Sequence, residues 1–262
     1  MSKAVFFDID GTLWDFHNQI PESAVRAIRQ LRKNGHYAFI CSGRSRAHIS
    51  NPDLLGIGFD GLVSACGAHV ELDGKRIYEK YIDSELAVHT VETVRKYGFR
   101  PILEGPEYLY MDDADFGDGP FGQKLKRELG DHLVSIADHY GSWVINKLSC
   151  ATNGADREGC LAALEEHYTY LIHNADVMEM VPKGHTKATG IQQMCDALGI
   201  DRADTFAVGD SVNDLAMLEY AGVGIAMGGG SAEAKAAADY VTTELQDDGI
   251  YHALLHFGLI SK

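Results

Sequence analysis

The chain has 262 residues, of which 45% are hydrophobic, and its formal net charge is −15. This length allows one large domain or two modest ones, with enough apolar residues for a substantial core. The acidic balance argues against a general binder of nucleic acid or of an anionic membrane, because such proteins need a basic surface. A phosphorylated substrate would need local cations to offset the same charge.

Cellular location is the next feature that the sequence addresses. We expect no signal segment, because residues 1–3 lead directly into an apolar strand, and no apolar run approaches membrane-spanning length. The five cysteines show no Cys-x-x-Cys spacing. They therefore favour free buried thiols in a reducing cytoplasm over disulfides or a zinc site. No sequence feature indicates an oligomeric state.

The first predicted element is an apolar strand at residues 4–7, which runs directly into Asp8 and then Asp10. A short apolar run bounded by a turn is typical of a strand buried in a parallel sheet, where ligands bind at the carboxyl ends of strands. Two acids at that edge repel each other, which favours a divalent cation beside them. The pair itself leaves three interpretations open: acids that cap the next turn, the metal-binding pair of a glycosyltransferase, or a nucleophile with its acid–base partner.

A second strand is predicted at residues 37–41, after a helix that opens at residues 21–23 and stops at residues 34–35. This strand ends in Ser42-Gly43-Arg44. A hydroxyl, a glycine and a helix start at a strand's carboxyl end form an anion site, because backbone N–H groups and the helix dipole point at the same place. Ser42 could also simply cap a helix over residues 44–55, and the two roles are compatible.

The next predicted elements are a strand at residues 59–65 and a hairpin that turns at Asp73-Gly74. Cys66 lies between them. It has no basic neighbour in sequence that would lower its pKa, so we expect a packed thiol rather than a nucleophile.

The middle of the chain, residues 82–181, loses the strand–helix–strand rhythm. The elements predicted there are helices at 84–97, 123–129 and 157–167, strands at 100–103, 108–111, 144–151, 168–173 and 177–181, and an acidic, glycine-rich loop at 112–122. This mixture predicts an α+β unit with an antiparallel sheet. The flanking residues 1–81 and 182–262, together roughly 160 residues, have the size of one domain. We therefore expect a discontinuous core domain with an inserted second domain.

The parallel-sheet pattern resumes with a helix at residues 187–198. Lys187 at its start opposes the helix dipole, which makes physical sense if an anion binds at the same place. A strand at 204–208 then leads into Gly209-Asp210-Ser211-Val212-Asn213-Asp214. The turn can aim Asp210 and Asp214 at one point, although an N-cap followed by an acidic first turn would use the same residues. Short strands at 223–228 and 238–242 and a last helix opening at 248–250 follow.

Four stretches, in this order, resemble the four motifs of the haloacid dehalogenase (HAD) superfamily of phosphatases and phosphotransferases. They are Asp8-Ile9-Asp10-Gly11-Thr12-Leu13, Ser42-Gly43-Arg44, Lys183-Gly184-His185-Thr186-Lys187 and Gly209-Asp210-Ser211-Val212-Asn213-Asp214. The insertion at 82–181 stands where the Cof-type branch carries a type IIB cap. The chain departs from the Cof-type pattern at Cys66 and Gly229, where Asn is usual, and Ser42 replaces the commoner Thr.

The resemblance implies an α/β fold, with a Rossmann-like parallel-sheet core at 1–81 and 182–262 and an α+β cap at 82–181. It implies a phosphatase of small phosphorylated metabolites, sugar phosphates first, with Mg²⁺ as cofactor. Asp8 would be the nucleophile that forms an aspartyl phosphate, and Asp10 the acid–base partner.

The resemblance also assigns the remaining groups of the site. Mg²⁺ would be held by Asp8, Asp210 and the backbone carbonyl of Asp10, with Asn213 and Asp214 in support. The phosphoryl oxygens would be held by Gly11, Ser42, Gly43 and Lys187. In the cap, we nominate Asp112, with the loop that it opens, and Glu179 as leaving-group contacts.

Three alternatives share these motifs. A phosphomutase would return the phosphoryl group to a sugar. A haloacid dehalogenase is disfavoured, because Asp10, which would protonate an alkoxide, is present. A non-catalytic sugar-phosphate sensor is possible, although all the expected charged groups are intact.

Overall fold

The computed structural model describes residues 2–116, 119–152, 155–172 and 177–262. The chain forms two compact units. The first unit comprises Met1–Gly43, Asn51–Tyr78 and Thr186–Lys262, and the second comprises Arg44–Ser50 and Glu79–His185. No helix in these described ranges has the length and apolar character needed to cross a membrane.

The first unit is built on an eight-stranded sheet with the order β14-β13-β12-β1-β2-β3-β4-β5. Its strands are β1 (Ala4–Phe7), β2 (Tyr37–Cys41), β3 (Gly61–Ser64), β4 (His69–Leu72), β5 (Lys75–Glu79), β12 (Thr205–Gly209), β13 (Val223–Ala226) and β14 (Tyr240–Val241). The pairs from β14 through β3 are parallel, and β4 joins β3 antiparallel. The predicted parallel-sheet α/β fold is thus confirmed.

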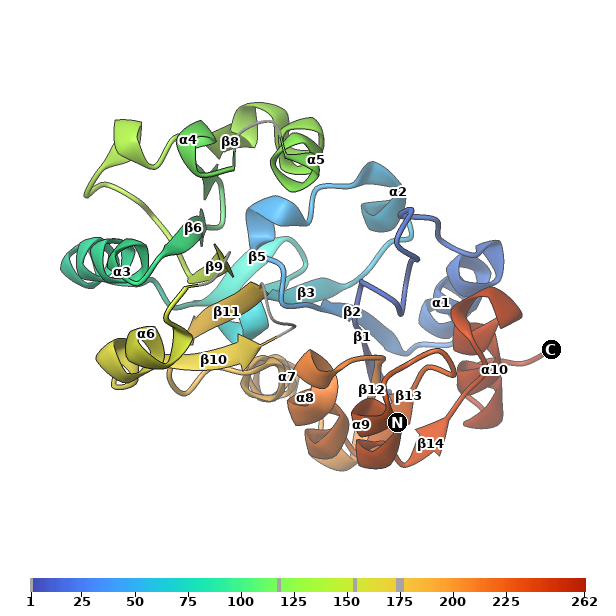
Figure 1. The fold of residues 1–262 in the computed structure, drawn as a ribbon. Helices are drawn as coiled ribbons and strands as arrows, with labels where there is room; N and C mark the ends of the chain where they lie inside the picture. The colour runs from blue at the N-terminus through green and yellow to red at the C-terminus, as the bar shows by residue number, and fades with distance from the viewer. Residues whose placement is uncertain (1, 117–118, 153–154, 173–176) are drawn as a thin grey trace. The chain divides into compact units, whose positions relative to one another are not determined.

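Helices lie on both faces of this sheet (Figure 1). They are α1 (Glu22–Lys33), α2 (Pro52–Leu55), α7 (Lys187–Leu198), α8 (Leu215–Tyr220), α9 (Ala232–Ala237) and α10 (Gly249–His256), with short 3₁₀ turns η2 (Ala65–Gly67), η5 (Arg202–Asp204), η6 (Val212–Asp214) and η7 (Leu245–Asp247). Apolar residues of α7, α8 and α9 pack with Phe6 and Phe39 in one core cluster. Successive strand residues face opposite sides, and Phe206 accordingly contacts Phe257 after α10 on the other face.

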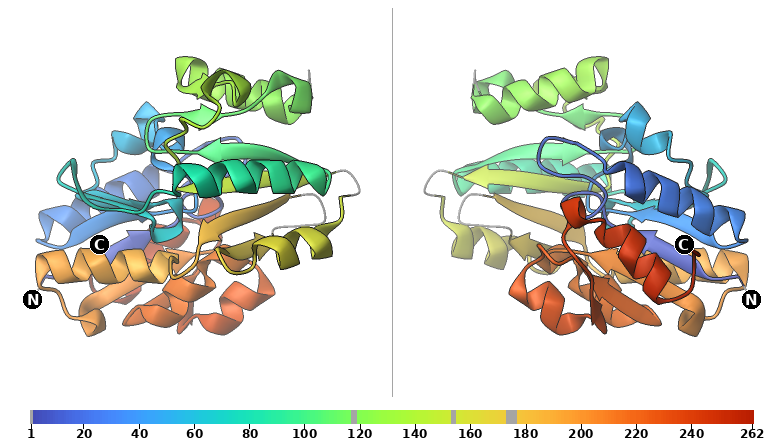
Figure 2. Two further views of the ribbon diagram at one scale, coloured as in Figure 1. Left: turned by 90° about the vertical axis from the view of Figure 1, so that its left-hand side faces the viewer. Right: turned by 90° about the vertical axis from the view of Figure 1, so that its right-hand side faces the viewer.

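The second unit contains a six-stranded sheet with the order β10-β11-β9-β6-β7-β8. Its elements are β6 (Phe99–Glu104), β7 (Leu109–Tyr110), β8 (Leu133–Val134), β9 (Lys147–Thr152), β10 (Tyr168–Ile172) and β11 (Val177–Pro182), helices α3 (Ser84–Lys96), α4 (Asp113–Phe116), α5 (Pro120–Leu129) and α6 (Arg157–Leu164), and the 3₁₀ turns η1 (Arg46–His48), η3 (Gly130–His132) and η4 (Ala137–His139). Pairs from β10 to β7 are antiparallel, as predicted. Helices α3 and α6 cover one face (Figure 2), where their apolar residues and those of β6, β9 and β11 form a separate core.

The helix predicted over residues 44–55 is wrong as a single element. The chain forms only the turn η1 and, after a break, the one-turn helix α2. Pro52 explains the break, because a proline lacks the N–H for an interior helix bond and pushes the preceding residue to extended backbone. Asn51 is extended and its side chain accepts hydrogen bonds from Asp53 and Leu54, so Asn51 and not Ser42 caps this helix.

The loop predicted at 112–122 is also wrong in part, because it contains α4 and the start of α5. Pro120 is the first residue of α5, a position where its fixed φ favours helix and its missing N–H costs nothing. Gly117 and Asp118 of that loop, and His173 at the end of a predicted strand, lie outside the described residues.

Candidate active site

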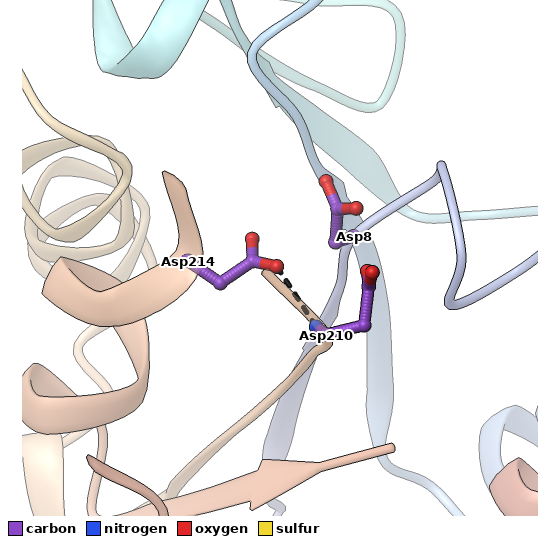
Figure 3. A group of neighbouring side chains, drawn as sticks. All are labelled: Asp8, Asp210 and Asp214. Carbon is purple, nitrogen blue, oxygen red and sulfur yellow. Dashed lines mark hydrogen bonds between the residues drawn. The ribbon is translucent and has the colours of Figure 1, made fainter. Parts of the chain in front are cut away.

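The candidate site begins where β1 and β12 end side by side. The two strands pair in parallel with Phe7 opposite Val208, so the residues that follow them are neighbours. The backbone N–H of Asp8 donates to the Val208 carbonyl at 2.9 Å, which extends this pairing by one residue. Asp8, just after β1, and Asp210, just after β12, consequently reach the same edge of the sheet (Figure 3).

Three carboxylates gather at this edge. Asp8, Asp210 and Asp214 each offer one oxygen, and these oxygens lie within 4.8 Å of one another. Asp214 reaches back across its turn, where Oδ2 accepts from the Asp210 N–H at 2.9 Å (Figure 3). The same oxygen accepts from the Ser211 N–H at 3.0 Å. The four-residue spacing therefore closes a turn through a side chain and aims both carboxylates at one place.

Lys187 provides the positive charge of this cluster. It is the first residue of α7, whose N-cap Thr186 forms a reciprocal capping box with Thr189. Its Nζ donates to Asp8 Oδ1 at 2.6 Å and to Asp214 Oδ1 at 2.5 Å, and its side chain is 1% exposed. Burial alone would lower the pKa of Lys187, but Asp214 and Asp8 raise it well above its ordinary value. The ammonium is therefore charged, and it links Asp8, the candidate nucleophile, to Asp214 in the turn after β12.

One ammonium does not balance three carboxylates, of which Asp8 and Asp214 are buried and Asp210 is partly buried. Burial and the Asp214 charge raise the pKa of Asp8 well above its usual range, although Lys187 opposes this rise. Burial and Asp214 likewise raise the pKa of Asp210 to about 6. A divalent cation would relieve this repulsion, and carboxylate oxygens are the donors that Mg²⁺ takes. The residues present thus fit a hard cation.

The loop after β1 packs closely against Asp210, one of the same carboxylates. Gly11 has φ +84°, and a Cβ built on it would lie 2.4 Å from Asp210 Oδ2, so only glycine fits there. The Thr12 hydroxyl donates to Asp210 Oδ1 at 3.0 Å. Asp10 is exposed, and the Trp14 indole N–H donates to its Oδ1 at 2.9 Å. The charge of Asp10 nevertheless acts on the cluster, because it contributes to the raised pKa of both Asp8 and Asp210.

Sequence reasoning singled out neither Thr12 nor Trp14. Thr12 had a usable signal, because it belongs to the Asp-x-Asp-Gly-Thr string itself. No such signal marked Trp14, because a tryptophan four residues after Asp10 is indistinguishable in the sequence from one more apolar residue.

Ser42 and Gly43 follow β2, which is the neighbour of β1 on the other side from β12. Both are buried, and the Ser42 N–H donates to the Val63 carbonyl at 2.9 Å. Asn213 is half-buried, with Oδ1 accepting from the Ser211 hydroxyl at 2.8 Å. The site residues that were predicted in the core domain thus all belong to the first unit. They follow the ends of its strands, except Lys187, which begins α7.

Asp112 and Glu179 belong to the second unit. Asp112 Oδ1 accepts from the Ser135 hydroxyl and the Ala137 N–H, and Arg95 binds Oδ2 at 2.8 Å. Glu179 forms an ion pair at 2.6 Å with the buried Lys147. The contacts of Asp112 and of Glu179 both stabilise the fold of the second unit.

Comparison with known proteins gives a consistent picture. Residues 5–254 match the family of haloacid dehalogenase-like hydrolases. The chain is 32% identical, over 99% of both chains, to "Putative phosphatase YkrA" of Bacillus subtilis (strain 168). It is similar to a hypothetical protein of Geobacillus kaustophilus HTA426, with a TM-score of 0.85, 29% identity and coverage of 99% of this chain and 100% of that one. The HAD subclass IIB sugar phosphatase BT4131 is similar at a TM-score of 0.83 and 28% identity, over 99% and 100% of the two chains.

Proposed function

Because the chain belongs to the haloacid dehalogenase-like hydrolases and is a phosphoric monoester hydrolase, we propose that it is a Mg²⁺-dependent phosphatase of small phosphorylated metabolites. The observation that carries this proposal is the buried Asp8 carboxylate, held 2.6 Å from the Lys187 ammonium at the carboxyl edge of a parallel sheet. A screen for Mg²⁺-dependent release of inorganic phosphate across a metabolite panel tests it. A product that is an isomeric phosphate ester, with no phosphate released, would instead indicate a phosphomutase.

The proposed reaction has two steps. In the first, an Asp8 oxygen forms a bond to phosphorus while the bond from phosphorus to the leaving oxygen breaks, and Asp10 gives its proton to that oxygen. In the second, Asp10 takes a proton from water, and the water oxygen forms a bond to the same phosphorus. The bond from phosphorus to the Asp8 oxygen breaks, which frees the Asp8 carboxylate and releases inorganic phosphate. The exposure of Asp10 supports this role, because its carboxyl group must exchange protons with substrate and water.

The remaining polar groups would hold the phosphoryl oxygens. The contact between the Lys187 ammonium and Asp8, the proposed nucleophile, supports this role for Lys187. The Ser42 hydroxyl and backbone N–H groups near Gly11 and Gly43 are proposed to hold the other oxygens. Their charge and dipoles would stabilise the negative charge that develops in the transition state.

Asp8, Asp210 and the Asp10 carbonyl are the groups that we propose to hold Mg²⁺. When bound, the cation neutralises charge on the phosphoryl oxygens. Asp214 would support the arrangement by holding Lys187 and the backbone of Asp210, and Asn213 by its contact with Ser211.

Hydrolysis should depend on Mg²⁺, and Ca²⁺ should substitute poorly. The larger ion tolerates more ligands and looser geometry, which would misplace Asp8 relative to phosphorus. We expect a chelator to suppress phosphate release, and excess Mg²⁺, but not Ca²⁺, to restore it. Undiminished release after exhaustive chelation would contradict the metal assignment.

We propose that residues 82–181 form a cap that contacts the leaving group, and that the core comprises 1–81 and 182–262. A cavity of about 370 Å³ within the second unit supports a ligand-contacting role, with Arg100, Phe116 and Ser149 among its lining residues. The similarity to BT4131, named a sugar phosphatase, supports sugar phosphates as substrates. Glu179 and Asp112 remain our candidates for specificity in this unit. We also propose a reducing, cytoplasmic location, since all five cysteines are buried free thiols.

Excision of residues 82–181 with a short linker should leave a foldable core, because each unit has its own apolar cluster. We expect the excised protein to hydrolyse small aryl phosphates weakly and to lose discrimination among metabolites. Relative kcat/KM values over the same metabolite panel measure this. If the parent's substrate ranking survived excision, specificity would have to reside in the core.

A further inference from the structure

The turn after β3 has an unusual backbone. Ala65, Cys66 and Gly67 have φ values of 49°, 51° and 88°, so three consecutive residues are left-handed. Glycine adopts this conformation freely, but Ala and Cys adopt it at a free-energy cost. Such strain persists only where the surrounding structure holds it, and it concentrates at functional sites. Nothing in the proposed reaction uses these three residues directly.

On one side, this turn holds Ser42. The Cys66 N–H donates to the Ser42 carbonyl at 3.2 Å, while the Ser42 N–H donates to Val63 at 2.9 Å. Both backbone groups of Ser42 are therefore bound by one segment, the end of β3 and the turn that follows. A change in the path of that turn would move the Ser42 carbonyl and, with it, the buried hydroxyl.

On its other side, the turn packs against the start of α7. A Cβ built on Gly67 would lie 2.1 Å from the Thr186 carbonyl oxygen and 3.1 Å from the Gly190 nitrogen. A Cβ on Gly190 would lie 3.0 Å from the Gly67 Cα and 2.3 Å from Val63. The backbones are thus in direct contact one residue before Lys187. This contact sets how closely the first turn of α7, which carries Lys187, approaches β3.

We propose that Cys66 and Gly67 are positioning residues, whose left-handed turn holds Ser42 and Lys187 at the separation that a phosphoryl group requires. The inference rests on the proposed function, in which these two side chains bind phosphoryl oxygens. The proposed reaction gives neither Cys66 nor Gly67 a contact with the reacting atoms. Their effect passes through the backbone of Ser42 on one side and of Thr186 on the other.

Two pairs of variants test this role by the inhibition constant of inorganic phosphate and by kcat/KM for p-nitrophenyl phosphate. Gly67→Ala forces a side chain into the Thr186 carbonyl. Its control is Gly199→Ala at the other end of α7, which has φ +66° and where a Cβ would meet no described atom within 4 Å. Cys66→Val keeps a small apolar side chain but resists the left-handed backbone, whereas Cys66→Gly accepts it.

Gly67→Ala and Cys66→Val should weaken phosphate inhibition and lower kcat/KM by about 10²-fold, the cost of misplacing a site by 1 Å. Gly199→Ala and Cys66→Gly should keep the wild-type inhibition constant even where their melting temperatures fall. If Gly67→Ala fails to fold, the comparison of Cys66→Val with Cys66→Gly tests the positioning role. Unchanged phosphate inhibition in Cys66→Val, with only a lower melting temperature, overturns the proposal.

Ser42→Ala separates failure of this inference from failure of the proposed function. Weaker phosphate inhibition in Ser42→Ala, together with wild-type inhibition in Gly67→Ala and Cys66→Val, overturns the positioning role alone. Wild-type phosphate inhibition in Ser42→Ala means that Ser42 does not bind the phosphoryl group, and the inference falls with that assignment.

Discussion

Asp8→Asn should abolish turnover of every phosphorylated substrate. The amide is not a nucleophile towards phosphorus, so no phosphoenzyme can form. Loss of a covalent nucleophile costs about 10⁶-fold in kcat in a well-studied protease, and we expect a decrease of that order. Phosphate release with p-nitrophenyl phosphate and with the best metabolite measures it, together with a search for phosphate bound to residue 8 in acid-quenched protein.

The fold of this variant should be intact. Burial and Asp214 raise the pKa of Asp8 well above its usual range, so ionised Asp8 destabilises the folded state where no cation offsets it. A neutral amide removes that repulsion, and we expect a melting temperature no lower than that of the parent in metal-free buffer. Asp201→Asn, at an exposed aspartate of the same unit, is the control and should retain full activity. Substantial turnover by Asp8→Asn would exclude Asp8 as the nucleophile.

Asp10→Asn should separate the two steps of the reaction. The nucleophile remains, and the amide oxygen can still accept the hydrogen bond from Trp14. The proton carrier is lost, and general acid–base catalysis is typically worth ~10²–10⁴-fold, so substrates with alkoxide leaving groups should slow by about that much. p-Nitrophenyl phosphate needs little protonation as it leaves, so its first step should survive better than hydrolysis of the aspartyl phosphate.

A burst of one nitrophenol per site, followed by slow turnover, is the expected signature. Phosphorylated Asp8 should then be recovered from an acid-quenched digest. Trp14→Phe is the matched control, because it removes the hydrogen-bond donor but leaves the Asp10 carboxylate, and it should accumulate no phosphoenzyme. Equal slowing of aryl and alkyl substrates in Asp10→Asn, without a trapped intermediate, would contradict the division of roles between Asp8 and Asp10.

The elements of the first unit were largely predictable from sequence, because their signals are local. Strand β2 and helix α7 have the predicted bounds, and the parallel arrangement follows from short apolar runs alternating with helices. Prediction failed where one local preference competed with another. A continuous helix was predicted over residues 44–55, but the restriction that Pro52 places on Asn51 divided it.

The candidate site was predictable as a set of residues, because each motif is a short string at the end of a strand or the start of a helix. Asp8, Lys187, Asp210 and Asp214 were all named from such strings. Their partners were not predictable in the same way. Lys187 contacts Asp8 across 179 positions of sequence and Asp214 across 27.

Only the tertiary structure decided which of these side chains meet, and at what backbone cost. Sequence spacing allowed both Asn213 and Asp214 to face the site, and packing buried Asp214 beside Lys187. Nothing local predicts three left-handed residues at Ala65–Gly67, two of which are not glycine. Periodicity and capping act within a few residues of chain, whereas ion pairs, close backbone approaches and strained turns are set by segments that become neighbours only when the sheet assembles.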